Sequence, residues 1–443
     1  MVLLRSRLTV IAACGALLLS ATPALTTPAL AADGSTGSTP TTAPGACAPN
    51  TDARLTVEEQ RLAGPVPQEV LSRSGFDRAA PALTRALCAA KDARQAEQVV
   101  QQHGRALWQR AVDRVQGRGP ARGDLARDDD RPLYWARLDM SRTLREWQPR
   151  FPLPEAGRAA LLDRLEVGSR GQDTMRLPAG KGVKRIVVTG FDPFQLDQDI
   201  RRSNPSGAAA LALDGTTIRT ADGPARIEVA VFPVRWADFT DGTVEKTLRP
   251  HFTAGPRQAD LFTTLSQGRP GRFDVERWNG AWRGGFPDNA NASVTGQIPV
   301  PDGTGRTGGT HGPQWTSTTL PYRALTEADT GPYPVRDNTE VTEVPAGATE
   351  PVTRPDGPTP GSAARSGGGG SYLSNEIAYR ATLLRDTTGL RAPGGHLHTP
   401  VLPWAPGNTD PDTGTLTDPD FLQARTAITT QIREALRVAA GQP

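Results

Sequence analysis

Two patterns of hydrophobic and polar positions divide the chain near residue 180. Before it, apolar residues recur every three or four positions, most clearly at 82–115 and 136–147, which is typical of amphipathic helices. After it, short apolar runs typical of buried strands alternate with helical stretches. Strands are predicted at 183–190, 225–234 and 394–403, and helices at 206–213 and 424–441. We therefore expect a small helical domain at 51–178 and an α/β domain at 182–443 whose sheet is covered on both faces.

The amino-terminal pattern predicts export. Arg5 and Arg7 precede an apolar run from Leu8 to Leu19, and residues 29–31 read Ala-Leu-Ala, the small-x-small pattern of a signal peptidase site. Residues 1–31 are therefore interpreted as a signal peptide and residues 32–50 as a Ser/Thr/Pro-rich linker. The expected location is secreted; in a rival interpretation the chain is a lipoprotein anchored through Cys14.

Cleavage at that site leaves two cysteines, Cys47 and Cys88. In an oxidising compartment an even pair predicts a disulfide. The alternative is two unpaired thiols without a role.

The net charge and the composition bear on which classes of partner to expect. The chain has 50 basic and 47 acidic side chains and a net charge of +3, which gives no reason to expect nucleic acid or an acidic membrane surface as a partner. Residues 336–370 are rich in Pro, Gly, Thr and Glu without a period. They are interpreted as a long surface loop, either a lid over a site or a disordered insertion.

Seven short motifs follow one another in the second half of the chain. They are TGFDPF at 189–194, SNPSGAAALALDG at 203–215, SQGRPGRFDVERWNG at 266–280, FPDN at 286–289, STTLPYRAL at 317–325, GSYLSN at 370–375 and HTPVLP at 398–403. In this order they resemble the pyroglutamyl peptidase I family, also called pyrrolidone-carboxylate peptidase. The resemblance covers residues 182–443.

The resemblance implies a three-layer α/β/α sandwich with a mostly parallel or mixed twisted sheet. It also implies removal of an amino-terminal pyroglutamyl residue from peptides by a Cys-His-Glu triad, without cofactor or metal. By position, the triad falls on Ser374, His398 and Glu276. Ser374 departs from the family's cysteine, and a hydroxyl is deprotonated far less readily than a thiol.

The same resemblance predicts a substrate pocket. Phe191 and Phe194 would contact the lactam ring, since pyroglutamate has no charged α-amine to solvate, and the pocket would extend to Tyr372 and Leu373. Backbone N–H groups of the glycine run before Ser374 are candidates for an oxyanion hole.

Two further polar residues are candidates for orienting the substrate or the oxyanion, namely Arg283 and Asn204. Arg277 is the alternative to Arg283, or only a salt-bridge partner. A second departure from the family concerns TGFDPF, because the glycines that usually follow this motif are replaced by QLDQDIRR.

Other interpretations of these residues stay open. Ser374 can be a loop hydroxyl, His398 a core histidine, and the two phenylalanines core packing. His396 and His398 on one strand would point the same way, as two metal ligands do. Two functions follow: a secreted serine-type hydrolase acting on peptides with a blocked amino terminus, or an inactive relative that binds peptide ends or a cell-envelope partner.

Overall fold

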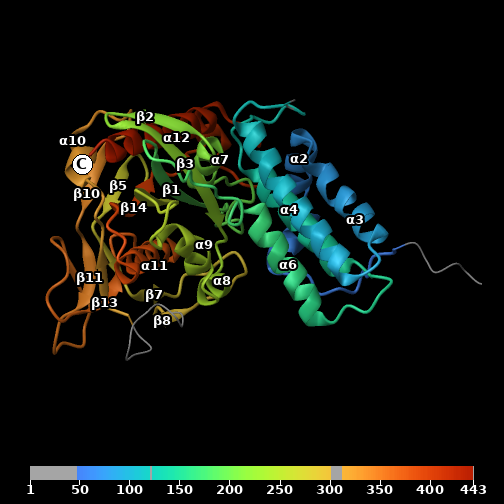
Figure 1. The fold of residues 1–443 in the computed structure, drawn as a ribbon, viewed down its shortest axis with the longest axis horizontal. Helices are drawn as coiled ribbons and strands as arrows, with labels where there is room; N and C mark the ends of the chain where they lie inside the picture. The colour runs from blue at the N-terminus through green and yellow to red at the C-terminus, as the bar shows by residue number, and fades with distance from the viewer. Residues whose placement is uncertain (1–46, 120–121, 301–311, 443) are drawn as a thin grey trace, which may run out of the picture. The chain divides into compact units, whose positions relative to one another are not determined.

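The computed structural model describes residues 47–119, 122–300 and 312–442, in which a helical part precedes an α/β part (Figure 1). The helices of the first part are α1 (Val57–Gln60), α2 (Pro65–Ser74), α3 (Ala79–Ala89), α4 (Ala93–Val115), α5 (Arg131–Glu146) and α6 (Glu155–Ser169), with 3-10 turns at Arg61–Ala63 and Phe76–Arg78. The expected signal peptide, Cys14 and the linker up to residue 46 lie outside the described residues.

The helical pattern predicted at 82–115 corresponds to two helices, α3 and α4. Asp92 separates α3 from α4 and accepts a hydrogen bond from the backbone N–H of Gln95 at 2.8 Å. An aspartate in this position satisfies one of the free N–H groups at the start of a helix. The second predicted stretch, 136–147, corresponds to α5.

Cys47 and Cys88 form a disulfide with a Cα–Cα distance of 5.6 Å. The bridge ties the start of the described chain to α3. Within the described residues, no helix is both long enough and apolar enough to cross a membrane.

The α/β part is built on a sheet that, in the described residues, has seven strands in the order β10-β5-β14-β4-β1-β3-β2. Strands β1, β3, β4 and β14 are parallel to one another, whereas β5 and β2 run antiparallel to their neighbours β14 and β3. The strands are β1 (Lys184–Phe191), β2 (Thr217–Thr220), β3 (Gly223–Phe232), β4 (Leu261–Gln267), β5 (Phe273–Glu276), β10 (Val335–Asn338) and β14 (Gly394–Thr399). The mixed, mostly parallel sheet agrees with the prediction.

Helices cover both faces of this sheet (Figure 1). On β1, Ile186 and Val188 pack toward α7 (Pro205–Leu213) and α12 (Pro419–Ala440), whereas Val187 packs toward α8 (Trp236–Thr240), α9 (Thr243–Phe252) and α11 (Leu373–Thr388). Successive strand residues point to opposite faces, so a continuous apolar run is needed when both faces are covered. The predicted α/β fold is confirmed.

The segment 336–370 is a correction to the expected long loop. After β10 it contains β11 (Val341–Val344), β12 (Val352–Arg354) and β13 (Ala363–Ser366), which form an antiparallel sheet of their own. Glu343, fully buried, accepts hydrogen bonds from the backbone N–H and hydroxyl of Thr359 at 2.6 and 2.7 Å. The segment is thus folded around a satisfied carboxylate, and its Pro and Gly residues lie mainly in the turns between short strands.

The remaining elements lie between β5 and β10 and near the carboxyl end. β6 (Trp278–Gly280) pairs with β9 (Trp315–Ser317), and β7 (Trp282–Gly284) pairs with β8 (Thr295–Gln297). A short helix, α10 (Tyr322–Glu327), and a 3-10 turn at Pro406–Asn408 complete them. One buried hydrophobic cluster includes residues of both parts, such as Trp135 of α5 and Val188 of β1, so the two parts share a core.

Candidate active site

The centre of the site is a buried pair, His398 and Glu276. His398 lies one residue before the end of β14, Glu276 ends β5, and the two strands are antiparallel neighbours. The Nδ1 of His398 lies 2.7 Å from Oε1 of Glu276, and the side chains are 8% and 0% exposed. With the carboxylate accepting from Nδ1–H, the other ring nitrogen, Nε2, is left as the basic one.

Asn338, at the end of β10, completes this arrangement. Its Nδ2 donates to Oε2 of Glu276 at 2.6 Å and to the carbonyl oxygen of Gly368 at 3.2 Å. Both carboxylate oxygens are therefore engaged, and such outer hydrogen bonds hold an orienting carboxylate in place. Asn338 was not predicted from the sequence, because β10 was interpreted as part of a loop.

Within the glycine run, Gly368 is required by its close approach to this pair. A Cβ at Gly368 would lie 2.1 Å from Oε2 of Glu276, and one at Gly369 would lie 3.4 Å from Cε1 of His398. Any side chain at Gly368 would therefore displace the carboxylate.

Ser374 lies on the other side of Gly369, in the first turn of α11. It is partly buried, and its hydroxyl donates to the carbonyl oxygen of Gly369 at 3.1 Å rather than to His398. The backbone N–H groups of Leu373, Ser374 and Asn375 have no acceptor among the described residues. A helix start with free N–H groups carries a partial positive charge, which favours an oxyanion.

A small pocket with a volume of about 30 Å³ opens beside Ser374. All four residues predicted for the substrate pocket line it. Phe194 lies 6.1 Å from Tyr372 between ring centroids, and Phe191 stacks on Phe239 at 6.1 Å. The lining residues are Phe191, Phe194, Asn204, Val234, Ser266, Gln267, Tyr372, Leu373 and Ser374. The pocket is thus largely apolar and aromatic, with a few polar groups at its wall.

Asn204, one of the two orienting candidates, lines this pocket but its amide is engaged. Its Oδ1 accepts from the backbone N–H of Ser206 at 3.1 Å and caps α7, and its Nδ2 donates to the carbonyl oxygen of Asp192 at 2.9 Å. It therefore joins the start of α7 to the segment between Phe191, the last residue of β1, and Phe194.

Arg283, the other candidate, lies elsewhere. Its guanidinium contacts both oxygens of Glu376 at 2.6 and 2.5 Å, and it also donates to the hydroxyl of Thr240 at 3.0 Å. It does not line the pocket. The expected contact between Arg283 and the substrate is therefore replaced by an anchor for the first turn of α11. Arg277 pairs with Asp337 at 3.0 Å, which agrees with its interpretation as a salt-bridge partner.

A second serine, not considered from the sequence, also faces this pocket. Ser266, at the end of β4, lies with its Oγ 2.8 Å from Nε2 of His396, whose Nδ1 lies 2.7 Å from the hydroxyl of Thr264. Both ring nitrogens of His396 are thus engaged by hydroxyls. Burial, together with the neighbouring His398, lowers the pKa of His396 well below its usual value, so this histidine stays neutral.

Side chains of the helical part contact the loops that surround the aromatic pocket. Arg61 donates to the carbonyl oxygen of Asn289 at 2.6 Å, and Asn289 in turn donates to the carbonyl oxygen of Pro193 at 2.8 Å. Glu58 accepts hydrogen bonds from Tyr134 at 2.8 Å and from Arg235 at 2.9 Å. Side chains of α1 and of the 3-10 turn after it therefore help to hold the loops around the aromatic pocket.

Comparison with known proteins places this architecture in a family. The PA0049 N-terminal domain matches residues 38–166, and the PA0049 C-terminal domain matches residues 185–303 and 333–403. The uncharacterized protein PA0049 of Pseudomonas aeruginosa is 35% identical over 505 residues, covering 89% of this chain and 91% of its own length. The chain belongs to the PA0049 family.

Solved structures similar to this chain include pyrrolidone carboxyl peptidases. The enzyme from Thermococcus litoralis is 19% identical with a TM-score of 0.38 and covers 58% of this chain and 93% of its own. A mutant of the Pyrococcus furiosus enzyme is 22% identical with a TM-score of 0.36, covering 57% and 98%.

Proposed function

We propose that this PA0049 family member is an exported hydrolase that removes a pyroglutamyl or related blocked residue from the amino terminus of peptides. The observation that carries the proposal is the buried His398–Glu276 pair at 2.7 Å, which lies beside a helix start that bears Ser374 and an aromatic pocket. A histidine oriented by a carboxylate next to a serine and free N–H groups is the combination that acyl transfer requires.

In the proposed reaction the serine hydroxyl turns from Gly369 toward Nε2 of His398. Its proton passes to the imidazole while Oγ bonds to the acyl carbon of the substrate, and the resulting oxyanion is held by the N–H groups at the start of α11. His398 then gives that proton to the leaving amine as the C–N bond breaks. Water, deprotonated by the same histidine, then bonds to the acyl carbon, the bond between Oγ and that carbon breaks, and His398 returns the proton to Oγ. Hydrogen bonds of this kind often form only with substrate present.

Export is part of the proposal. It is supported by the predicted signal peptide at 1–31 and by the Cys47–Cys88 disulfide, since such bridges persist in oxidising compartments.

A second candidate function is binding without turnover. One observation favours it: the Ser374 hydroxyl is already satisfied by the Gly369 carbonyl at 3.1 Å, in a site whose resemblance calls for a thiol. The aromatic pocket would then hold a blocked peptide end without cleaving it.

The two candidates are separated by one assay on the mature chain with a fluorogenic pyroglutamyl amide. Hydrolysis should be lost in Ser374→Ala and in His398→Ala and retained in Ser371→Ala, a matched serine three positions earlier in the same segment. A chain that cleaves none of a panel of blocked aminoacyl amides, yet binds a pyroglutamyl peptide, supports the second candidate instead.

A further inference from the structure

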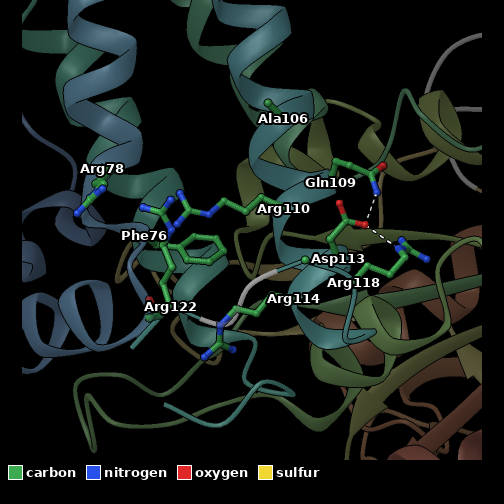
Figure 2. Close-up of a pocket in the computed structure, with 11 residues that line it drawn as sticks. Phe76, Arg78, Ala106, Gln109, Arg110, Asp113, Arg114, Arg118 and Arg122 are labelled. Atoms are coloured by element: carbon green, nitrogen blue, oxygen red, sulfur yellow. Dashed lines mark hydrogen bonds and ion pairs between the residues drawn. The ribbon is translucent and has the colours of Figure 1, made fainter. Parts of the chain in front are cut away.

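A second pocket lies entirely within the helical part, between the turn after α2, the helix α4 and the segment that follows α4 (Figure 2). Its volume is about 500 Å³, and it shares no lining residue with the pocket beside Ser374. Five arginines line it, and we call it the arginine pocket: Arg78, Arg110, Arg114, Arg118 and Arg122.

Few of these charges are neutralised by a contact. Arg118 pairs with Asp113 at 2.7 Å, the one carboxylate that lines the pocket. Among the described residues, the other four arginines have no ion pair with a carboxylate. Arg114 instead donates to backbone carbonyl oxygens between residues 125 and 127 at 2.6 to 2.7 Å. The pocket therefore carries an excess of positive charge.

Three arginines crowd one end of the arginine pocket around Phe76. The guanidinium of Arg110 lies over the Phe76 ring at 4.3 Å and donates to the carbonyl oxygen of Gly75 at 2.6 Å. Figure 2 shows the guanidinium groups of Arg110 and Arg122 pointing toward one another, with Phe76 beside them. Arg78 and Arg122 make no hydrogen bond to any described residue, so their donors are available.

The electrostatics agree with this geometry. Burial, and the positive charges of Arg122 and Arg78, lower the pKa of Arg110. The negative charge of Asp77 opposes this effect only in part. Guanidinium groups brought together repel one another, and an anion between them converts the repulsion into attraction. Two converging guanidiniums offer paired N–H donors that match the oxygens of a phosphate group.

We propose that the arginine pocket binds a multiply charged phosphate-bearing anion, with Arg110 and Arg122 on either side of a phosphate group and Arg78 at the rim. The volume exceeds what a single phosphate fills, so the ligand carries a second phosphate or an organic body that reaches the neighbouring wall. The proposal does not depend on the peptidase reaction, because the two pockets have no residue in common.

The test is titration calorimetry of the mature chain with inorganic pyrophosphate and, separately, with glycerol 3-phosphate, at constant ionic strength. Binding of either probe should weaken at least tenfold in Arg122→Gln and in Arg78→Gln. Both variants should fold, since neither side chain has a partner to lose. The matched control is Arg219→Gln, which removes the same charge from an exposed position on β2.

Each result decides the proposal. Saturable binding that is lost in Arg122→Gln and kept in Arg219→Gln supports it, and the probe that binds tells a second phosphate from an organic body. No binding of either probe, or an equal loss in all three variants, overturns it in favour of a solvated basic surface.

Discussion

The guanidinium of Arg137, on α5, donates hydrogen bonds to both carboxylate oxygens of Asp192 at 2.9 Å, and the two side chains are only 1% and 3% exposed. Arg170, at the end of α6, is a second partner of the same carboxylate. Asp192 stands between Phe191 and Phe194 in the chain. The helical part therefore fixes the loop that supplies the aromatic wall of the pocket.

Replacing Arg137 should damage both stability and the pocket. Arg137→Met removes one partner of a buried carboxylate, which typically costs about 3 kcal/mol or more of unfolding free energy. Urea denaturation measures this loss. The matched control is Arg142→Met on the same helix, whose ion pair with Glu146 is 39% exposed on the arginine side and should contribute at most about 1 kcal/mol. Equal midpoints for the two variants would show that the buried contact carries no special weight.

Restoring a thiol at position 374 tests the site without knowledge of its substrate. In Ser374→Cys, the free N–H groups of α11 and the neighbouring His398 should lower the thiol pKa below about 7.5, against about 8.5 for an ordinary cysteine. The rate of alkylation by iodoacetamide as a function of pH gives this value. Ser72→Cys, an exposed position on α2, serves as the reference. A thiol at 374 that titrates like the reference would contradict the proposed role of His398.

The close approach of the glycine run to Glu276 gives a third prediction. Gly368→Ala should push the carboxylate away from His398, because the new methyl group would lie 2.1 Å from Oε2. If the proposed function holds, kcat should fall at least 100-fold with little change in KM. Gly255→Ala, where a Cβ would meet nothing within 4 Å, is the matched substitution and should leave both constants unchanged.

A fourth experiment distinguishes the roles of the two serines in the pocket, Ser374 and Ser266. Ser266→Ala leaves Nε2 of the buried His396 without its 2.8 Å partner, so we expect a loss of roughly 1–3 kcal/mol of stability. Turnover by the folded fraction should stay within about tenfold of the parent. Although Ser266 stands opposite His398 in the sheet, its hydroxyl is engaged by His396, whereas Ser374 stands at the free N–H groups of α11. If turnover instead vanishes in Ser266→Ala and survives in Ser374→Ala, Ser266 is the attacking group.

Stability should depend on pH through Asp130, at the start of α5. Burial and the adjacent charge of Asp129 raise the pKa of Asp130 from 3.8 to about 6. Between these values the folded chain binds more protons than the unfolded chain, so the free energy of unfolding should fall as pH rises from about 4 to 6, by roughly 3 kcal/mol from this group.

The variant Asp130→Asn isolates this contribution. Its amide can accept from the backbone N–H of Asn204, as the carboxylate does at 2.9 Å, and can donate to the hydroxyl of Ser203. Urea midpoints measured from pH 4 to 7 should show a shallower decline in this variant than in the parent or in Asp329→Asn, an exposed control. Parallel profiles for all three proteins would exclude Asp130 as the source.

Much of the fold was predictable because its signals are local. The apolar runs at 183–190 and 394–403 predict β1 and β14, and the helical period at 424–441 predicts most of α12. Strand β4, by contrast, reads LFTTLSQ and is buried although polar, because His396 engages the hydroxyls of Thr264 and Ser266. A pattern of hydrophobicity does not contain that information.

The residues of the candidate site were likewise predictable only in part. Ser374, His398, Glu276 and the four pocket residues could be named from the sequence, because each lies in one of the short motifs that carry the resemblance. Asn338 and Ser266 were missed since their roles come from strand pairing between segments far apart in the chain. The pairing of Arg283 with Glu376 was not foreseen, because motif position does not reveal this partner.

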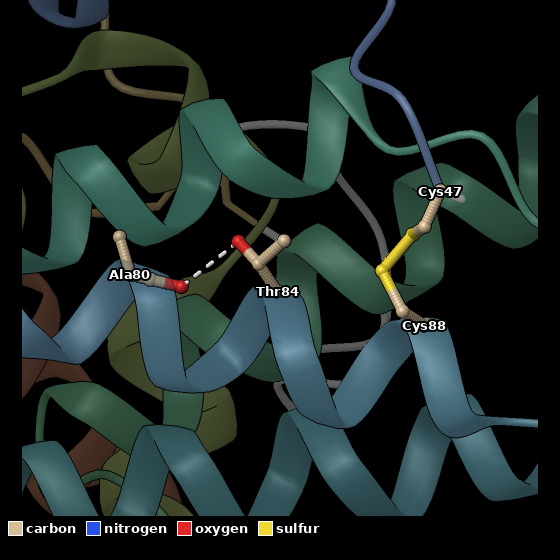
Figure 3. Close-up of a disulfide and its surroundings, with 4 residues drawn as sticks. All are labelled: Cys47, Ala80, Thr84 and Cys88. Carbon is tan, nitrogen blue, oxygen red and sulfur yellow. Dashed lines mark hydrogen bonds between the residues drawn. A yellow bond between two sulfur atoms is a disulfide. The ribbon is translucent and has the colours of Figure 1, made fainter. Parts of the chain in front are cut away.

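The disulfide between Cys47 and Cys88 (Figure 3) closes a loop whose ends are 41 positions apart. Helices α1 and α2 lie within this stretch of the chain. A bridge of this span typically contributes roughly 4 kcal/mol by restricting the unfolded chain. Arg61, which holds the loop at Asn289 behind the aromatic pocket, belongs to the enclosed segment. The redox state of the surroundings thereby becomes a condition for the shape of the pocket: a thiol reductant, acting on a bridge outside the pocket, would loosen its aromatic wall.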